Sequence, residues 1–138
     1  MAAVAPVCDF GWKGIDAILP GVDGNQHQLS DYVGPGGLVV AFICNHCPYV
    51  KAVIGRIVRD ADDLRAHGVG FVAVNSNDAA AYPADSFDNM KAFAREHRMS
   101  FPYLHDEDQS NLIDKALNAA VPALQAIESQ ERSFRSMT

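Results

Sequence analysis

The spacing of apolar residues changes twice between residues 37 and 74, and these changes predict a β-α-β unit. Residues 37–43 (GLVVAFI) form an apolar run without alternation, which is typical of a strand covered on both faces. From Pro48 to Leu64 apolar residues recur at helical spacing, and Gly68 is a suitable stop. Residues 69–74 (VGFVAV) are a second buried strand. A strand, a helix of about twenty residues and a strand predict two parallel, adjacent strands.

A β-hairpin is predicted before this unit. Residues 15–19 and 27–29 are short extended pieces on either side of Val-Asp-Gly-Asn at residues 22–25. Asp-Gly between two such pieces is typical of a hairpin turn. Ser30 could cap a short turn of helix that follows the second piece.

Two further helices are predicted after the unit. A polar loop follows the second strand, and then Asp85 or Ser86 can cap a helix that runs through His97. Residues 101–104 are short and extended, and residues 109–119 carry an apolar stripe at helical spacing. The tail that follows has only weak periodicity, so we predict no strand there.

Composition and charge exclude several functional classes. The chain has 138 residues, enough for one domain with a hydrophobic core, and its formal net charge is −6. Its 11 basic residues are scattered, so we expect no nucleic-acid partner. No apolar run approaches the roughly 18–20 residues that cross a bilayer, so we expect no membrane partner either. The N-terminal residues do not resemble a secretory signal, and we expect a cytoplasmic location.

The junction between the first strand and the long helix, FICNHCPYVK, contains the candidate chemistry. Cys44 follows the strand and Cys47 is expected on the first helical turn, three residues later. This spacing brings two Cβ atoms within disulfide range. The helix N-terminus would lower the pKa of Cys44, and His46 adds a possible cation beside it. The pattern therefore predicts a redox-active pair, because a cytoplasmic Cys-x-x-Cys is catalytic or metal-binding.

Two other interpretations of the pair remain open. Both thiols could simply be packed in the core at a helix start. A zinc site would need four ligands, and a second Cys/His pair is missing. A copper site made from Cys44, Cys47 and a remote histidine is possible, because soft thiolates suit Cu(I). His67, His97 and His105 are distant in sequence, and no spacing marks them as ligands.

Long motifs suggest a family. The segments FICNHCPYVKA, VAVNSNDAAAYPADSFDNMKAFA and FPYLHDEDQ, preceded by CDFGWKGIDAILPGVDGNQHQLSDY, resemble the thioredoxin-fold, peroxiredoxin-like proteins of the alkyl-hydroperoxide-reductase and thiol-specific-antioxidant superfamily. The resemblance runs from about residue 7 to residue 109. It implies an α/β, thioredoxin-like fold, in which one domain over residues 1–138 has a central mixed sheet around the β-α-β core.

The resemblance also implies two alternative roles for the thiols. In one, Cys44 attacks a substrate disulfide and Cys47 resolves the mixed disulfide. In the other, Cys47 is oxidised by peroxide to a sulfenic acid that Cys44 resolves. Cys44 replaces the threonine with which peroxiredoxins activate peroxide, and their arginine has no obvious counterpart here. We therefore favour thiol–disulfide exchange over efficient peroxide reduction. The expected partners are a protein or small-molecule disulfide or peroxide and a thiol reductant, with no cofactor.

The chain departs from the family after residue 109. Family members continue into a stretch with a cis-proline, two strands and a helix, whereas residues 110–138 are divergent. Pro122 falls close to the position of that proline. We favour the interpretation that the family frame is lost near Ser110, which leaves the C-terminal hairpin incomplete or altered. The exposed sheet edge could then favour a homodimer, or the chain could be an inactive, truncated family member.

The predicted site follows from these considerations. The catalytic residues are Cys44, Cys47 and His46, and the supporting residues are Asn45, Pro48 and Pro122. Polar residues at the end of the second strand, Asn75, Asn77 and Asp78, lie on the same edge as the thiols and could line the site. Cys8 is a possible extra resolving thiol, and Trp12 and Tyr49 are candidate apolar walls for a partner.

Overall fold

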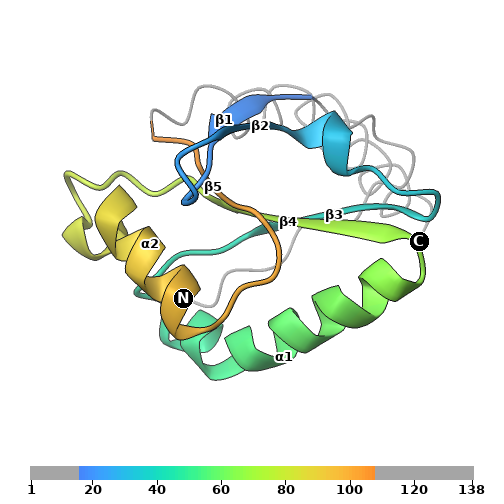
Figure 1. The fold of residues 1–138 in the computed structure, drawn as a ribbon. Helices are drawn as coiled ribbons and strands as arrows, with labels where there is room; N and C mark the ends of the chain where they lie inside the picture. Colours follow the sequence, from blue (N-terminus) through green and yellow to red (C-terminus); the bar gives the residue numbers. More distant parts are fainter. Residues whose placement is uncertain (1–15, 108–138) are drawn as a thin grey trace, which may run out of the picture.

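The computed structural model describes residues 16–107, and the predicted β-α-β unit forms its centre (Figure 1). Strand β3 (Gly37–Phe42) leads into helix α1 (Pro48–Ala66), which returns the chain to strand β4 (Val69–Asn75). The two strands are parallel, in register from Gly37 opposite Val69 to Phe42 opposite Val74. Strand β5 (Tyr103–His105) pairs in parallel with the other side of β4, which gives the order β3-β4-β5. The prediction of parallel, adjacent strands is confirmed.

Proline and glycine set the limits of α1. Pro48 occupies the first helical turn, where its missing N–H costs nothing and its fixed φ suits the helix. The helix ends at Ala66, and Gly68 has φ of +77°, a left-handed conformation that glycine adopts without a Cβ clash. This turn returns the chain directly into β4, as the sequence predicts.

The predicted hairpin is present, with one correction. Strands β1 (Ile18–Pro20) and β2 (Gln26–Gln28) are antiparallel, and the 3₁₀ helix η1 (Leu29–Tyr32) follows directly. Ser30 lies inside η1 and does not cap it, because the turn already begins at Leu29. The hairpin joins the sheet through an antiparallel bridge between Gly21 and Leu104.

Helix α2 (Phe87–Glu96) follows the short 3₁₀ helix η2 (Pro83–Asp85). The prediction that either Asp85 or Ser86 caps this helix is resolved in favour of Ser86. Its hydroxyl accepts the backbone N–H of Asn89 at 3.2 Å. Asp85 is therefore free for another role.

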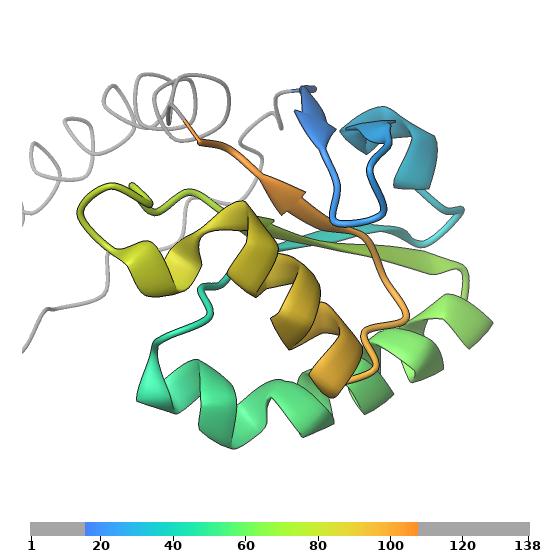
Figure 2. The same cartoon turned by 60° about the vertical axis from the view of Figure 1, so that its left-hand side comes forward.

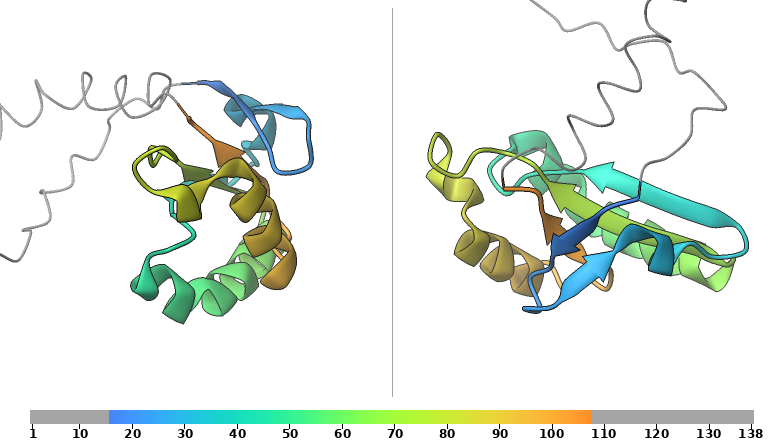
Figure 3. Two further views of the ribbon diagram at one scale, coloured as in Figure 1. Left: turned by 90° about the vertical axis from the view of Figure 1, so that its left-hand side faces the viewer. Right: turned by 90° about the horizontal axis from the view of Figure 1, so that it is seen from above.

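Side-chain alternation along β4 divides the core into two faces. Val72 and Val74 pack with the hairpin and η1 on one face, whereas Phe71 and Ala73 pack with α1 and α2 on the other. Figures 2 and 3 show the two helices on one side of the sheet and the hairpin on the opposite side. Each fully buried aliphatic side chain, such as Ile54 of α1, contributes roughly 1.5–3 kcal/mol. Strand β4 is thus covered on both faces, as its unbroken apolar sequence predicts, whereas the same prediction for β3 is wrong within the described residues, because β3 is an edge strand with no buried residue.

Strand β3 is the sheet edge within the described residues. It carries two exposed apolar side chains, Val39 at 37% and Phe42 at 52%.

No helix in the described part of the chain is long and apolar enough to cross a membrane. The predicted helix 109–119, Cys8, Trp12 and Pro122 lie outside the described residues, so the interpretation of residues 110–138 stays a prediction.

Candidate redox site

The loop between β3 and α1 holds both thiols at the carboxyl end of the parallel sheet. The N–H of Ile43 still donates to the carbonyl of Val74 at 3.0 Å, so the sheet guides the chain to Cys44. Cys47 precedes the first helical turn as the N-cap of α1, a correction of one residue to its predicted position. Its side chain makes no hydrogen bond to the helix. Both thiols are free and partly buried.

The electrostatics of Cys44 differ from the prediction. Burial raises its pKa, and the negative charge of Asp85 and the neighbouring Cys47 raise it further. Backbone N–H groups of Cys47 and His46 hydrogen-bond the sulfur and act in the opposite direction. The net pKa of Cys44 lies above the ordinary value, so the predicted lowering is wrong. The helix start is present, but burial and a neighbouring carboxylate outweigh it.

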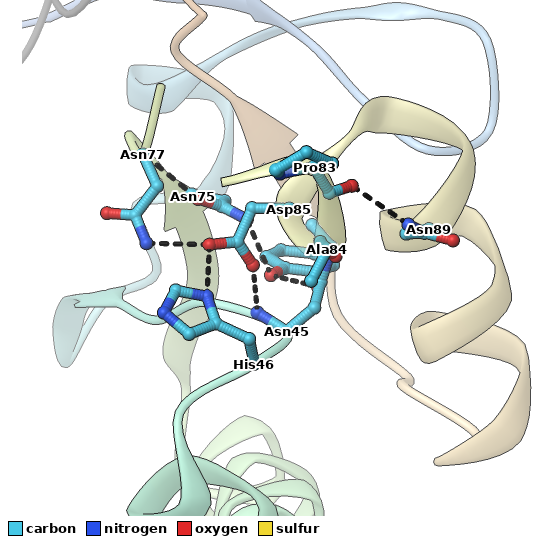
Figure 4. A network of polar contacts seen from close by, with 9 residues as sticks. Asn45, His46, Asn75, Asn77, Pro83, Ala84, Asp85 and Asn89 are labelled. Atoms are coloured by element: carbon cyan, nitrogen blue, oxygen red, sulfur yellow. Dashed lines mark hydrogen bonds and ion pairs between the residues drawn. The ribbon is translucent and has the colours of Figure 1, made fainter. Parts of the chain in front are cut away.

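Asp85 is the centre of a polar network (Figure 4), and one of its carboxylate oxygens lies within 4.8 Å of the Cys44 sulfur. One carboxylate oxygen accepts the backbone N–H of Asn45 at 2.7 Å. The other accepts the side-chain amide of Asn77 at 2.7 Å and is 2.5 Å from Nδ1 of His46. These contacts join the thiol loop, the loop after β4 and η2, which are far apart in sequence. Asp85 therefore fixes the position of the loop that bears Cys44.

Asp85 stays ionised although it is fully buried. Burial alone would raise its pKa, but hydrogen bonds from Asn77, Asn45 and His46 together bring the pKa below the ordinary carboxyl value. The network thus maintains a negative charge in the protein interior close to Cys44. Sequence reasoning considered this residue only as a helix cap.

Asn45 anchors the thiol loop to the core. Its side-chain amide donates to the carbonyl of Ala84 at 3.1 Å, and its side-chain oxygen accepts the hydroxyl of Tyr103 at 2.8 Å. Burial raises the pKa of Tyr103, with smaller contributions from Asp85 and Cys44, so the hydroxyl keeps its proton and acts as a donor. The predicted supporting residue is therefore a structural clamp between the thiol loop, η2 and β5.

His46 lies between this network and the protein surface. Its side chain is 37% exposed, and its ring stacks on Tyr82 with centroids 5.3 Å apart. An ionised carboxylate can only accept hydrogen bonds, so the short contact with Asp85 places a proton on Nδ1. In the neutral ring Nε2 is then the acceptor nitrogen. Asp85 thereby selects the tautomer of His46.

Of the other polar residues predicted near the thiols, two join the network and one does not. Asn77 binds Asp85, and its backbone N–H donates to the side chain of Asn75 at 3.0 Å. Asp78 is exposed and caps the local turn through the N–H of Ala80. Tyr49 is 83% exposed, so it is not a core residue.

A compact donor cluster lies beside Cys44. Its sulfur, a ring nitrogen of His46 and a carboxylate oxygen of Asp85 lie within 4.8 Å of one another. Nδ1 and both Asp85 oxygens are already engaged in hydrogen bonds. Among the described residues this cluster is organised as a hydrogen-bonded network, and His67, His97 and His105 are not part of it.

A groove of about 550 Å³ opens beside His46, between the thiol loop and α2. Its lining is mixed, with the apolar ring of Phe93 and the charged side chains of Lys51 and Glu96. A substrate in this groove would lie against His46.

The family of this chain is shown by a match over most of its length. Residues 10–130 match the model described as the AhpC/TSA family. The chain belongs to this family. The match covers the thiol loop, the Asp85 network and the complete β-α-β unit.

Two solved structures resemble this AhpC/TSA-family chain in sequence as well as in fold. An uncharacterized conserved protein from Geobacillus kaustophilus is 48% identical, with a TM-score of 0.69, and the alignment covers 75% of this chain and 54% of that one. A hypothetical protein from Sinorhizobium meliloti 1021 is 34% identical, with a TM-score of 0.74, and coverage is 81% and 60%. The chain therefore spans between half and two thirds of the length of these relatives. None of the curated proteins matches it.

A more distant structure supports the fold alone. The thioredoxin domain of a thiol-disulfide oxidoreductase from Bacteroides vulgatus is 13% identical, with a TM-score of 0.63. The alignment covers 83% of this chain and 75% of that domain. Together with the family match, this confirms the predicted α/β, thioredoxin-like fold of the AhpC/TSA-family chain.

Proposed function

We propose that this chain is a thiol–disulfide oxidoreductase that uses Cys44 as the attacking thiol and Cys47 as the resolving thiol. Its AhpC/TSA-family membership and thioredoxin-like fold support a general redox function. The finer assignment comes from the site. Cys44 forms a mixed disulfide with the substrate, and Cys47 then attacks the Cys44 sulfur and releases the reduced product. An external thiol reductant regenerates the dithiol.

One observation carries this proposal. The backbone N–H groups of His46 and Cys47, at the start of α1, act on the Cys44 sulfur so as to lower its pKa. This start is otherwise uncapped, since Cys47 makes no side-chain bond to the helix. A thiolate that forms at Cys44 is therefore met by fixed donors and by the positive end of the helix dipole. Cys47 occupies the adjacent helix-cap position, where a resolving thiol is needed.

Disulfide exchange is favoured over efficient peroxide reduction by the groups around the thiols. The network is built from asparagine, histidine, tyrosine and aspartate side chains, and its single carboxylate is negatively charged. A negative charge beside the sulfur does not polarise a peroxide towards attack. Two thiols three residues apart, by contrast, supply both nucleophile and resolver.

Insulin-disulfide reduction and peroxide consumption test the proposal on the purified full chain. Cys44→Ser and Cys47→Ser should each lower the rate of insulin reduction by at least about 100-fold, because each removes one half of the exchange cycle. Cys8→Ser is the matched control for loss of a thiol and should retain activity. Wild-type rates in both thiol variants would contradict the proposal, and peroxide consumption that exceeds insulin reduction would favour the peroxidase alternative.

A further inference from the structure

The cluster of Cys44, His46 and Asp85 contains the elements of a proton-transfer chain. A ring nitrogen of His46 and an oxygen of Asp85 lie within 4.8 Å of the Cys44 sulfur. One bridging water molecule can relay a proton over such a distance. Asp85 binds Nδ1 of His46 at 2.5 Å, which leaves Nε2 as the nitrogen that can accept a proton.

We propose that His46 carries the proton between the Cys44 thiol and the leaving thiol of the substrate, and that Asp85 is its positioning residue. This inference rests on the proposed thiol–disulfide exchange. Two observations support it: a buried carboxylate holds the imidazole of His46, and a groove opens beside that imidazole.

The step balances without a further reactant. In the proposed step, neutral His46 accepts the proton of the Cys44 thiol at Nε2 through a bridging water molecule and becomes imidazolium. The Cys44 thiolate attacks one sulfur of the substrate disulfide, so that an S–S bond forms to Cys44 as the substrate S–S bond breaks. The departing sulfur takes the electron pair of the broken bond and receives the proton from His46. The products are a mixed disulfide, a free thiol and neutral His46.

The placement of Asp85 suits this role better than a purely structural one. The carboxylate is completely buried, yet it contacts the one ring of the network that reaches the surface. Backbone and amide donors from Asn45 and Asn77 hold it on the other sides. It cannot move to solvent, so the ring it binds has a fixed orientation. The charge also stabilises the imidazolium at the moment when the proton is on His46.

The substrate class follows from the chemistry of the leaving group. The thiolate of an ordinary alkyl thiol leaves slowly unless it is protonated, whereas an acidic aromatic thiolate leaves without a proton. The groove beside His46 is lined by Lys51 of α1 and by Glu96 and His97 at the end of α2. A peptide or small alkyl disulfide that occupied this groove would lie against His46, the ring that the proposed proton transfer uses. We therefore assign alkyl disulfides, such as those of cysteine side chains, as the substrates for which His46 matters.

The experiment compares two disulfides in a single turnover. In the Cys47→Ser background, Cys44 forms the mixed disulfide and the reaction stops there. The probes are glutathione disulfide, which has an alkyl leaving thiol, and dithiobis(nitrobenzoate), which has an acidic aromatic one. Any change in the amount of Cys44 thiolate alters both rates equally and cancels in their ratio. That ratio is a readout which a merely structural role would not move.

His46→Asn should lower the rate with glutathione disulfide, relative to the aromatic probe, by roughly 100-fold, the lower end of general acid–base contributions. Asp85→Asn should lower the same ratio by about tenfold or more, because the ring loses its fixed tautomer. Exposed His67→Asn, at the C-terminal end of α1, and exposed Asp78→Asn are the matched controls and should leave the ratio unchanged. Circular dichroism checks the fold of each variant, and His46→Asn keeps the contacts of Asp85 with Asn45 and Asn77.

The outcomes separate this inference from the proposed function. An unchanged ratio in folded His46→Asn overturns the role of His46 while exchange by Cys44 stands. A lowered ratio in His46→Asn with an unchanged ratio in folded Asp85→Asn overturns the positioning role of Asp85. Should Asp85→Asn fail to fold, the His46→Asn ratio decides the proton-transfer role. Glutathione-disulfide exchange that survives Cys44→Ser overturns the proposed function itself.

Discussion

The two α-helices of the described residues begin in opposite ways: the start of α2 is capped by a side chain, and the start of α1 faces the reactive sulfur. At the start of α2, the Ser86 hydroxyl accepts the N–H of Asn89, and Asp88 adds negative charge to the first turn. At the start of α1, Cys47 occupies the cap position without a side-chain bond, and the first turn has no acidic residue. The donors of α2 are thus used internally, whereas the positive end of α1 remains available to a sulfur anion.

Asp85 couples these two helix starts. It directly precedes the cap of α2 and binds the loop that precedes α1. The capped start of α2 therefore helps to hold in place the loop that leads into the uncapped start of α1.

Cys47→Ser should have the largest effect, and it should act in opposite directions on activity and stability. Without the resolving thiol, turnover of disulfide substrate should fall by at least about 100-fold. Serine is a good N-cap, and residue 47 has the extended φ and ψ of an N-cap residue. The free energy of unfolding should therefore rise by up to about 1 kcal/mol. Insulin reduction and urea unfolding under reducing conditions measure the two quantities. An unchanged urea midpoint would mean that α1 does not lack a cap.

The decrease in the free energy of unfolding between pH 6 and pH 3 tests the link that Asp85 makes between the two helix starts. Asp85 has a folded-state pKa below its unfolded value near 4, so its contribution is present above that value and is lost as pH falls through the folded pKa. The lost charge-assisted hydrogen bonds amount to about 2 kcal/mol. Urea unfolding from pH 6 to pH 3 should show a decline that is shallower in Asp85→Asn. Asp78→Asn is the control, and a slope equal to wild type in Asp85→Asn would contradict the prediction.

Ser86→Ala should remove the cap of α2 without altering the chemistry at α1. The free energy of unfolding should fall by about 1 kcal/mol. The single-turnover rate of Cys44 should remain within about twofold of wild type, because the cap of α2 does not contact the sulfur. Ser86→Thr keeps a capping hydroxyl and is the matched control. A large loss of rate in folded Ser86→Ala would show that the two helix starts are not separable.

Cys44 should produce the smallest effect, a decline of stability at alkaline pH. Its folded-state pKa is raised, so its contribution is complete below the unfolded pKa near 8.5 and is lost as pH rises through the folded value. Urea unfolding at pH 7.5 and pH 9.5, with reductant, should show a smaller difference in Cys44→Ala than in wild type. Cys47→Ala serves as the comparison. An equal decline in wild type and Cys44→Ala would contradict the raised pKa.

The sequence predicts the β-α-β unit because its apolar pattern is local. Residues 37–43 and 69–74 are apolar without interruption, and Pro48 and Gly68 mark the helix between them. These signals extend over a few neighbouring residues, so no knowledge of distant contacts is needed. They also place Cys44 and Cys47 at the carboxyl end of the sheet to within one residue.

The role of Asp85 could not be predicted in this way. It lies 40 residues after Asn45, and the bond between them depends on how two loops meet. Locally, Asp85 and Ser86 are both good caps, and the pattern does not indicate that one of them is surplus. The presence of a second good capping residue, Asp85, directly before the actual cap Ser86 is the one feature of the sequence that indicates another role for Asp85. The pKa of Cys44 was predicted with the wrong sign because both causes of the raise, burial and this distant carboxylate, arise only in the folded chain.

The register of the central strands determines where the chain can change in length. Phe42 lies opposite Val74, and Val74 lies opposite Leu104, so the two loops that bind Asp85 leave the sheet side by side. Deletion of one residue from β3 would reverse the faces of the following side chains and shift the sulfur by about 3.3 Å along the strand. Engineered insertions are better placed in the exposed turn at Asp23–Asn25, on the hairpin, where an added peptide would leave the reactive loop undisturbed.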